Sequence, residues 1–249
     1  MKFFLFVNGF RFYCFTKLSL YDILFSIGVD FMDFRSKKYI LLDLDGTLTD
    51  TEEGVVNAFL YSLSKIGVTV EDRNTMRWII GPPIIESYKR MLSCSEEEAK
   101  KLLDGYREYY NDRGIWENRL YDGIEEMLLK LHEGGKILFT ATSKPDVFAK
   151  RILDKHGVSK YFKHIYGSKL DGSISTKEDV LNSIIDGEGI DISECVLVGD
   201  TKYDIIGARE LNMDVIGIRW GFGTEEEFVQ YPPDKLLTTP WDVLDELIG

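Results

Sequence analysis

The stretch from Tyr39 to Leu48, YILLDLDGTL, decides the fold of this chain. Four apolar residues are followed by Asp43 and Asp45, and then by Gly46. A short, unbroken apolar run of this kind is typical of a strand that is buried on both faces of a parallel sheet. The two acids therefore follow the end of a strand, where open α/β sheets bind their ligands.

Similar short runs recur along the chain and alternate with segments of helical period. They are Lys136–Thr142, His164–Tyr166, Cys195–Asp200 and Asp214–Ile218. This alternation predicts an α/β fold with a doubly wound parallel sheet that is covered by helices on both faces. Capping patterns, each with an acid three positions later, predict helix starts at Thr49, Ser95, Asp122, Ser175 and Thr224. Pro145 and Pro240 suit first helical positions.

A long segment with helical spacing separates the first two strands. It covers residues 51–119, and its apolar positions include Val55, Phe59, Leu63 and later Leu102 and Tyr106. Because a connection between parallel strands needs only one helix, a segment of this length favours a small all-helical cap domain. The catalytic core is then expected to comprise residues 38–50 and 120–249.

Composition limits the classes of function. The 249 residues are 44% hydrophobic and 29% charged, as expected of a soluble globular protein. With 30 Lys and Arg against 42 Asp and Glu, the net charge of −12 argues against a nucleic acid polymer as partner. Cys14, Cys94 and Cys195 suggest neither a disulfide framework nor a zinc site, which fits a reducing cytoplasm. Oligomeric state stays open.

The first residues differ in composition from the rest. Phe and Tyr account for ten of residues 1–31, while Asn8, Arg11 and Lys17 interrupt any long apolar run. This pattern fits neither a secretory signal nor a spanning helix, and no membrane partner is expected. We expect residues 1–37 to be an extension outside the fold, with Met32 as a natural start. A surface anchor is the alternative, because aromatic residues with scattered basic ones suit a membrane interface.

Acidic residues follow two of the predicted strands. Asp43 and Asp45 follow the first, and Asp200 and Asp204 follow the run that begins at Cys195. If these strands are neighbours, three or four carboxylates meet at one place. Like charges so close raise one another's pKa unless a hard divalent cation neutralises them, and oxygen ligands of this kind suit Mg²⁺.

The other strand ends offer groups that suit a phosphate. Thr142, Ser143 and Lys144 precede a predicted helix, and Lys177 stands in the first turn of another. Hydroxyls, backbone N–H groups and an ammonium bind phosphoryl oxygens well. Lysine opposes the helix dipole in a first turn, which favours a functional role for Lys177. Carboxylates, Mg²⁺ and a phosphate cradle together indicate phosphoryl transfer.

In this order and spacing, the motifs resemble those of the haloacid dehalogenase superfamily of phosphatases. The motifs are Asp43-x-Asp45-Gly46-Thr47, Thr142, Lys177 and Gly199-Asp200-x-x-x-Asp204, with a helical insertion after the first. The resemblance covers nearly all of residues 38–249. The chain is similar above all to the phosphoglycolate phosphatase-like branch, through Ile80-Gly-Pro-Pro83, Ala141-Thr-Ser-Lys-Pro145 and Trp220-Gly-Phe-Gly223.

The resemblance implies a role for each motif residue. Asp43 would attack phosphorus and form an aspartyl-phosphate, and Asp45 would act as general acid and then as general base. Mg²⁺ would be held by Asp43, the backbone carbonyl of Asp45 and Asp200, with Asp204 binding directly or through water. Thr142 and Lys177 would stabilise the transferring phosphoryl group, and Ser143 and Lys144 would join them in binding the substrate.

The resemblance also implies the substrate class and leaves alternatives open. A carboxylate at Asp45 favours hydrolysis, because dehalogenases carry Tyr and P-type ATPases a non-carboxylate there. The expected substrates are small phosphorylated metabolites, phosphoglycolate first and nucleoside monophosphates second. A phosphosugar mutase and a non-catalytic binding or regulatory module are the alternatives. The loop Gly81-Pro82-Pro83 either breaks a helix or closes over the substrate, and none of the arginines of the cap is singled out.

Overall fold

The computed structural model describes residues 4–7, 10–13 and 33–249, which belong to two compact units, Met1–Asp33 and Phe34–Gly249. In the smaller unit, β1 (Phe4–Val7) and β2 (Phe10–Tyr13) pair antiparallel, with Phe4 opposite Tyr13. Met32 and most of residues 1–31, for which a position outside the fold is expected, lie outside the described residues. No helix in the described ranges is both long and apolar enough to cross a membrane.

The larger unit begins with η1 (Phe34–Ser36), four residues before the core expected from the sequence. Phe34 is only 2% exposed and belongs to the main hydrophobic core. The Lys37 ammonium donates to the carbonyl of Ser193 and pairs with Asp214. Residues 34–37 are therefore anchored to the core by both apolar and polar contacts.

A six-stranded parallel sheet forms the centre of this unit, in the order β10-β9-β8-β3-β6-β7. Its strands are β3 (Tyr39–Leu42), β6 (Ile137–Pro145), β7 (Phe162–Ser168), β8 (Cys195–Gly199), β9 (Asp214–Ile218) and β10 (Lys235–Leu237). The predicted fold class is confirmed, and all five predicted strands are present. β10 was not predicted, because it has only three residues and none of them is fully buried.

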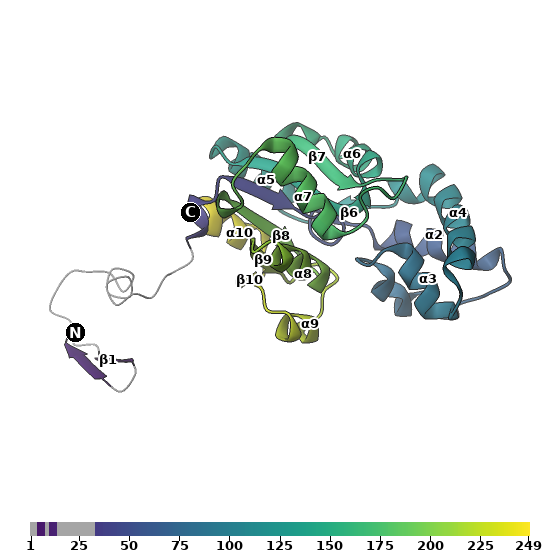
Figure 1. Ribbon diagram of the computed structural model, residues 1–249, viewed down its shortest axis with the longest axis horizontal. Coiled ribbons are helices and arrows are strands. Elements are labelled where there is room, and N and C mark those ends of the chain that lie inside the picture. Colours follow the sequence, from purple (N-terminus) through teal and green to yellow (C-terminus); the bar gives the residue numbers. More distant parts are fainter. Residues whose placement is uncertain (1–3, 8–9, 14–32) are drawn as a thin grey trace. The chain divides into compact units, whose positions relative to one another are not determined.

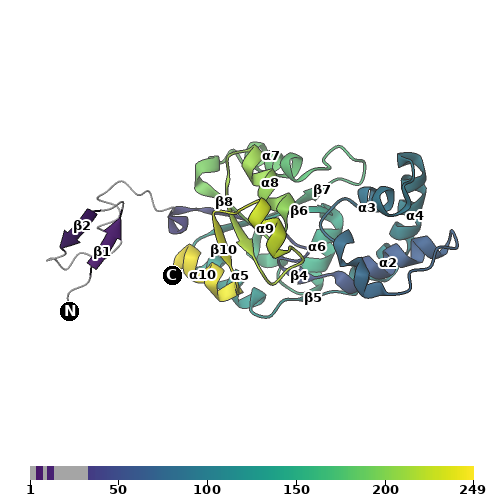
Figure 2. The same ribbon diagram turned by 90° about the horizontal axis from the view of Figure 1, so that it is seen from below.

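Helices cover both faces of the sheet, as Figure 2 shows. One face packs against α5 (Ile124–Glu133), α6 (Asp146–Lys155) and α10 (Pro240–Ile248), and the other against α7 (Lys177–Glu188) and α8 (Lys202–Glu210). Along β3, Ile40 and Leu42 join the first core and Tyr39 and Leu41 the second. This alternation follows from the two-residue period of a strand, and it explains why the whole run is apolar.

The segment between β4 (Thr49–Asp50) and β5 (Arg119–Leu120) is a helical insertion, residues 51–118. It contains α2 (Glu52–Ser64), η2 (Arg73–Ile79), α3 (Ile84–Leu92), α4 (Glu96–Asp112) and η3 (Gly114–Trp116). β4 and β5 pair antiparallel, so the chain leaves and re-enters the core at one place. The three α-helices lie together at one end of the sheet (Figure 1).

Helix starts agree with the sequence prediction at some positions and differ at others. Ser95 and Thr224 are N-caps, and Pro240 occupies a first helical position. The predictions of Thr49, Asp122 and Ser175 were wrong by one or two residues, because the N-caps are Thr51, Gly123 and Thr176. Pro145 is an N-cap rather than a first helical residue. Short helices η4 (Ser159–Tyr161), η5 (Ile192–Glu194) and α9 (Glu225–Gln230) complete the unit.

Candidate active site

The order of the strands brings the predicted motifs together. β3 lies at the centre with β6 and β8 as its two neighbours, and Leu42 is level with Thr140 on one side and Val198 on the other. Asp43, Thr142 and Asp200 follow these positions within two residues on adjacent strands. Because the strands are parallel, all three residues lie at the carboxyl edge of the sheet, where such sheets bind ligands.

Three carboxylates converge at this edge. Asp43, Asp200 and Asp204 are buried, and each offers an oxygen within 4.8 Å of the others. Asp200 is fixed at both oxygens, because Oδ1 accepts from the Thr47 hydroxyl at 3.1 Å and Oδ2 from the Phe222 backbone N–H at 2.7 Å. Asp204 closes a capping box at the start of α8, where its Oδ2 accepts from the N–H and the hydroxyl of Thr201.

Lys177 places one cation among these acids. It is the first residue of α7, held there by the capping box of Thr176 and Asp179. Its buried ammonium donates to Asp43 Oδ1 at 2.9 Å and to the Ala141 carbonyl at 2.6 Å. It also lies 2.7 Å from Asp204 Oδ1, an ion pair without hydrogen-bond geometry. Burial lowers the pKa of Lys177, but the carboxylates of Asp204 and Asp43 outweigh burial and raise it.

Burial and neighbouring negative charges raise the pKa values of two of these acids. Burial raises the pKa of Asp43 to about 6, with Asp204 and Asp45 adding to the rise and Lys177 opposing it. Burial, Asp204 and Asp43 raise the pKa of Asp200 well above its ordinary value. The protein thus confines negative charge where water cannot solvate it, which is costly unless a counter-ion binds.

The charges and donor atoms of this cluster fit a divalent cation. Three carboxylates and the single ammonium of Lys177 leave two negative charges when all four groups are ionised. The available donors are carboxylate oxygens, which are the ligands that Mg²⁺ prefers. Asp43 Oδ2 has no hydrogen bond or ion pair with any residue that the structure describes, so this oxygen is not engaged within the protein.

Asp45 lies beside this cluster, in a separate ion pair. Its Oδ2 is 2.7 Å from the ammonium of Lys144, whose side chain is only 6% exposed. The same ammonium lies 4.8 Å from the centre of the Tyr110 ring, which α4 of the insertion contributes. Asp45 Oδ1 is buried without a partner among the described residues. A buried carboxylate oxygen without a partner is positioned to exchange a proton with a bound molecule.

The remaining predicted residues lie around the same place. Thr142 is 1% exposed, and its hydroxyl accepts from the Lys144 N–H at 3.2 Å. Ser143 is half-buried, and its carbonyl accepts from the Ser168 hydroxyl. Thr142, Ser143 and Lys144 all line one cavity with Asp43, Asp45 and Lys177. The structure therefore brings every predicted site residue to one region, with Asp200 buried just behind the cavity wall.

This cavity has a volume of about 900 Å³ and is closed on one side by the insertion. The loop Gly81-Pro82-Pro83 joins η2 to α3 and lines the cavity, as do Tyr106 and Tyr110 of α4. Those two rings also stack on each other with centroids 5.4 Å apart, so the tyrosines pack within the insertion as well as lining the cavity.

Several supporting residues were not predicted from the sequence. Thr47 and Phe222 fix Asp200, and the Trp220 indole donates to the Thr47 carbonyl at 2.9 Å. These residues belong to motifs that the sequence analysis recognised, but the sequence did not show which atoms they contact. Lys144 was expected to meet the phosphate, and the ion pair with Asp45 was not foreseen.

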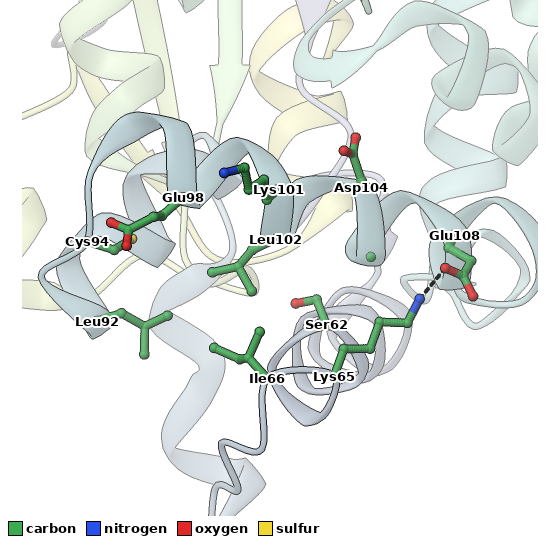
Figure 3. A pocket seen from close by; sticks show the side chains of 11 residues that line it. Ser62, Lys65, Ile66, Leu92, Cys94, Glu98, Lys101, Leu102, Asp104 and Glu108 are labelled. Atoms are coloured by element: carbon green, nitrogen blue, oxygen red, sulfur yellow. Dashed lines mark hydrogen bonds and ion pairs between the residues drawn. The ribbon is translucent and has the colours of Figure 1, made fainter.

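A second hollow, of about 560 Å³, lies within the insertion (Figure 3). Ile66, Leu92 and Leu102 line it, and the ion pair of Lys65 with Glu108 stands at its edge. None of the residues predicted to be catalytic lines this hollow. The larger cavity is therefore the candidate active site.

Comparisons with known proteins assign the family. Residues 40–218 match the family model described as haloacid dehalogenase-like hydrolase. The chain belongs to this family, as the resemblance of its motifs implied.

Named relatives cover most of the chain. A 5′-nucleotidase of Pseudomonas aeruginosa is 38% identical over 78% of this chain and 88% of its own length. Tyrosine-protein kinase PtkA of Mycobacterium tuberculosis is 37% identical over 82% of this chain and 68% of its own length. A phosphoglycolate phosphatase of Colwellia psychrerythraea is 28% identical over 84% and 96%.

Solved structures support the same assignment. A crystal structure described as a predicted phosphatase from Clostridium acetobutylicum has a TM-score of 0.82 and 39% identity, covering 84% of this chain and 97% of that one. The structure of PtkA from Mycobacterium tuberculosis has a TM-score of 0.73 and 34% identity, covering 86% and 98%.

Proposed function

We propose that this haloacid dehalogenase-like hydrolase is a Mg²⁺-dependent phosphatase that cleaves small phosphate monoesters through an aspartyl-phosphate on Asp43. One observation carries the proposal. A buried carboxylate, Asp43, with one free oxygen lies against a lysine and two further acids, and the half-buried carboxylate of Asp45 lines the same cavity two residues later. The family and the names of two of its relatives support it.

Asp43 acts as the nucleophile. Its Oδ1 is held by Lys177, so Oδ2 is the oxygen that attacks phosphorus. The new bond joins Oδ2 to phosphorus, and the bond from phosphorus to the ester oxygen breaks. Lys177 holds the attacking carboxylate in place and balances charge on the phosphoryl oxygens.

Asp45 moves the proton in both half-reactions. Its orphaned Oδ1 gives a proton to the leaving alkoxide, and then takes one from the water that attacks the phosphoaspartate. That attack breaks the bond between phosphorus and Asp43 and releases phosphate. Lys144 holds Oδ2 of Asp45, so it orients the acid as well as adding positive charge.

The phosphoryl group is bound by the end of β6. Thr142 and Ser143 offer hydroxyls, and the ammonium groups of Lys144 and Lys177 flank the same cavity. Asp43, the Asp45 backbone carbonyl, Asp200 and Asp204 would hold Mg²⁺, with Asp204 binding directly or through water. When bound, Mg²⁺ supplies Lewis-acid stabilisation of charge on the phosphoryl oxygens.

A phosphate-release assay with Mg²⁺ tests the proposal on 2-phosphoglycolate, nucleoside 5′-monophosphates and sugar phosphates. Native protein should release phosphate, and Asp43→Asn should lower turnover by at least about 10³-fold with unchanged circular dichroism. Asp45→Asn should lower turnover by about 10²–10⁴-fold. After incubation with ³²P-labelled substrate, this variant should retain the label on the protein.

Two results would contradict this function. Isomerised sugar phosphate without free phosphate would indicate a mutase instead. Transfer of phosphate from ATP to tyrosine, without release from any monoester, would indicate the activity in the name of the mycobacterial relative.

A further inference from the structure

Arg107 stands out among the cations of the active-site cavity. Six basic residues line this cavity: Lys100, Lys101, Arg107, Lys144, Lys169 and Lys177. Five of them have acid partners, which are Glu96, Glu97, Asp45, Asp146 and, for Lys177, both Asp43 and Asp204. The Arg107 guanidinium forms no hydrogen bond, ion pair or ring contact with any residue that the structure describes.

This lack of a partner is unusual because Arg107 is half-buried. A guanidinium carries five N–H donors in a rigid fork and stays charged at any physiological pH. Asp104 lies one turn earlier on α4 and lines the same cavity, but it makes no ion pair with Arg107. A half-buried cation without a partner gains most from an anion supplied by a bound molecule.

The position of Arg107 on α4 relates it to the reaction centre. Arg107 and Tyr110 are three residues apart, so they are neighbours on one helix face, about 5–6 Å apart at Cβ. The Tyr110 ring contacts Lys144, whose ammonium pairs with Asp45. Arg107 and Tyr110 both line the cavity on the side that α4 contributes. Because Asp43 and Arg107 line one cavity, a molecule with its phosphate at Asp43 has Arg107 on the wall of the space that holds its other end.

We propose that Arg107 determines specificity by binding a second anionic group of the substrate, either a carboxylate or a second phosphate. This inference rests on the proposed phosphatase function and narrows it. The preferred substrates are phosphate monoesters that carry another negative charge, rather than nucleoside monophosphates. Both anion types form the same bidentate pairs with a guanidinium, so substrates of two lengths must separate them.

Matched substrate pairs test this specificity. The first pair is 2-phosphoglycolate with 2-hydroxyethyl phosphate, in which an uncharged hydroxymethyl group replaces the carboxylate. The second is glucose 1,6-bisphosphate with glucose 6-phosphate. For at least one pair, native protein should favour the doubly charged member at least tenfold in kcat/KM. Arg107→Gln should raise its KM about 10–100-fold, with kcat nearly unchanged and the singly charged member unaffected.

Two variants serve as controls. Lys100→Gln removes a cation of the same helix and cavity that already has a partner, and it should keep the native preference. Arg107→Lys keeps the positive charge but loses the forked geometry of the guanidinium. Its KM for the doubly charged substrate should therefore lie between those of native protein and Arg107→Gln. Which pair responds identifies the second anion as a carboxylate or a phosphate. Equal native activity on both members of each pair, or equal losses on both in Arg107→Gln, would overturn the proposal.

A binding measurement separates this proposal from the phosphatase function. Calorimetry on Asp43→Asn, with and without Arg107→Gln, measures affinity for the same pairs without turnover. If native protein releases no phosphate but the binding preference depends on Arg107, the phosphatase function fails and the anion site stands. If neither pair shows a binding preference, the anion site fails.

Discussion

Gly46 shows how a single residue can shape the candidate site. Its φ is +90°, a region open to glycine, and a Cβ there would lie 2.0 Å from Asp200 Oδ2. Any other residue must therefore displace the Asp200 carboxylate from its position in the acid cluster. Gly46 in the first motif therefore leaves the space that the Asp200 carboxylate of the last motif occupies.

We expect Gly46→Ala to lower phosphatase activity about 10²-fold, because Asp200 is displaced by roughly an ångström. The backbone strain should also cost about 1–2 kcal/mol of unfolding free energy. Gly135→Ala is the matched control, since Gly135 has φ +80° with no atom within 4 Å of the added Cβ. It should show similar destabilisation, measured by urea unfolding, with native activity. Equal activity of the two variants would refute the role of Gly46.

At the scale of elements, α7 links a helix cap to the acid cluster of the candidate site. Thr176 accepts from the Asp179 N–H and thereby fixes the first turn, in which Lys177 stands. The same capping box occurs at Thr239 and Asp242 of α10, among whose residues none lines the cavity. Comparing the two caps therefore distinguishes the effect of a cap on the stability of the fold from its effect on the position of Lys177.

Thr176→Ala and Thr239→Ala should each lose about 1 kcal/mol of stability, the usual value of an N-cap. Only Thr176→Ala should also lose activity, by roughly tenfold, because the Lys177 ammonium shifts from Asp43. Unfolding curves and phosphate release on the same preparations provide the comparison. A matched loss of activity in Thr239→Ala would mean that stability alone explains the effect.

Glu188 holds the other end of α7 against β7. Its side chain is 5% exposed and pairs with Lys163 at 2.6 Å, while the Tyr166 hydroxyl donates to it at 2.9 Å and His164 contacts the same oxygen. Burial raises the pKa of Glu188, but these three partners outweigh burial and lower it to about 2 from an ordinary value of 4.5.

A lowered folded-state pKa means that the ionised form stabilises the fold. This stabilisation is complete above about pH 4.5 and is lost as pH falls toward 2. Glu188→Gln should therefore be less stable than native protein at pH 7, and the difference should shrink at pH 3, measured by urea unfolding. Glu97→Gln, at an exposed helix pair, should change stability by less than about 0.5 kcal/mol. A difference for Glu188→Gln that stays constant with pH would contradict this assignment.

For the whole molecule, the excess negative charge of the acid cluster predicts a response to metal. A cation that binds only the folded state at 100 times its Kd adds about 2.7 kcal/mol of stability. For a unit of this size, that corresponds to a rise in Tm of roughly 5–10 °C.

Thermal unfolding with and without Mg²⁺ should show this rise, and chelation should reverse it. Asp200→Asn should largely abolish the response, because one of the three carboxylates of the cluster is lost. Glu225→Gln removes an exposed acid that pairs with Arg219, and it should respond like native protein. An unchanged Tm in native protein at millimolar Mg²⁺ would contradict the proposed metal site.

The sequence predicted those parts of the fold that depend on local periodicity. Tyr39 to Leu42 could be recognised as a central strand because both of its faces are apolar, and Asp43 follows directly. The sequence predicted helix starts less accurately where two residues that can cap a helix are adjacent. At Ser175 and Thr176, the choice depends on which hydroxyl meets the third N–H, and a shift of one residue exchanges Glu178 for Asp179 as partner.

Contacts between distant segments could not be predicted in the same way. Lys144 and Asp45 are far apart in sequence, and their 2.7 Å ion pair depends on the offset between β3 and β6. Arg107 is one of several arginines in the insertion, and only the folded helix shows that it faces the cavity without a partner. Charge and motif spacing therefore predicted which residues lie together in the candidate site, whereas the features that would select a substrate required the tertiary structure.

The antiparallel pair β4–β5 has a consequence for how such an enzyme could acquire new substrates. Thr49 lies opposite Leu120 and Asp50 opposite Arg119, with the Arg119 guanidinium donating to Asp50 Oδ2 at 2.9 and 3.2 Å. Everything between these residues can be exchanged as one cassette without breaking a hydrogen bond of the central sheet. Grafting a foreign helical module at this junction would alter what the enzyme accepts while its chemical machinery is inherited intact.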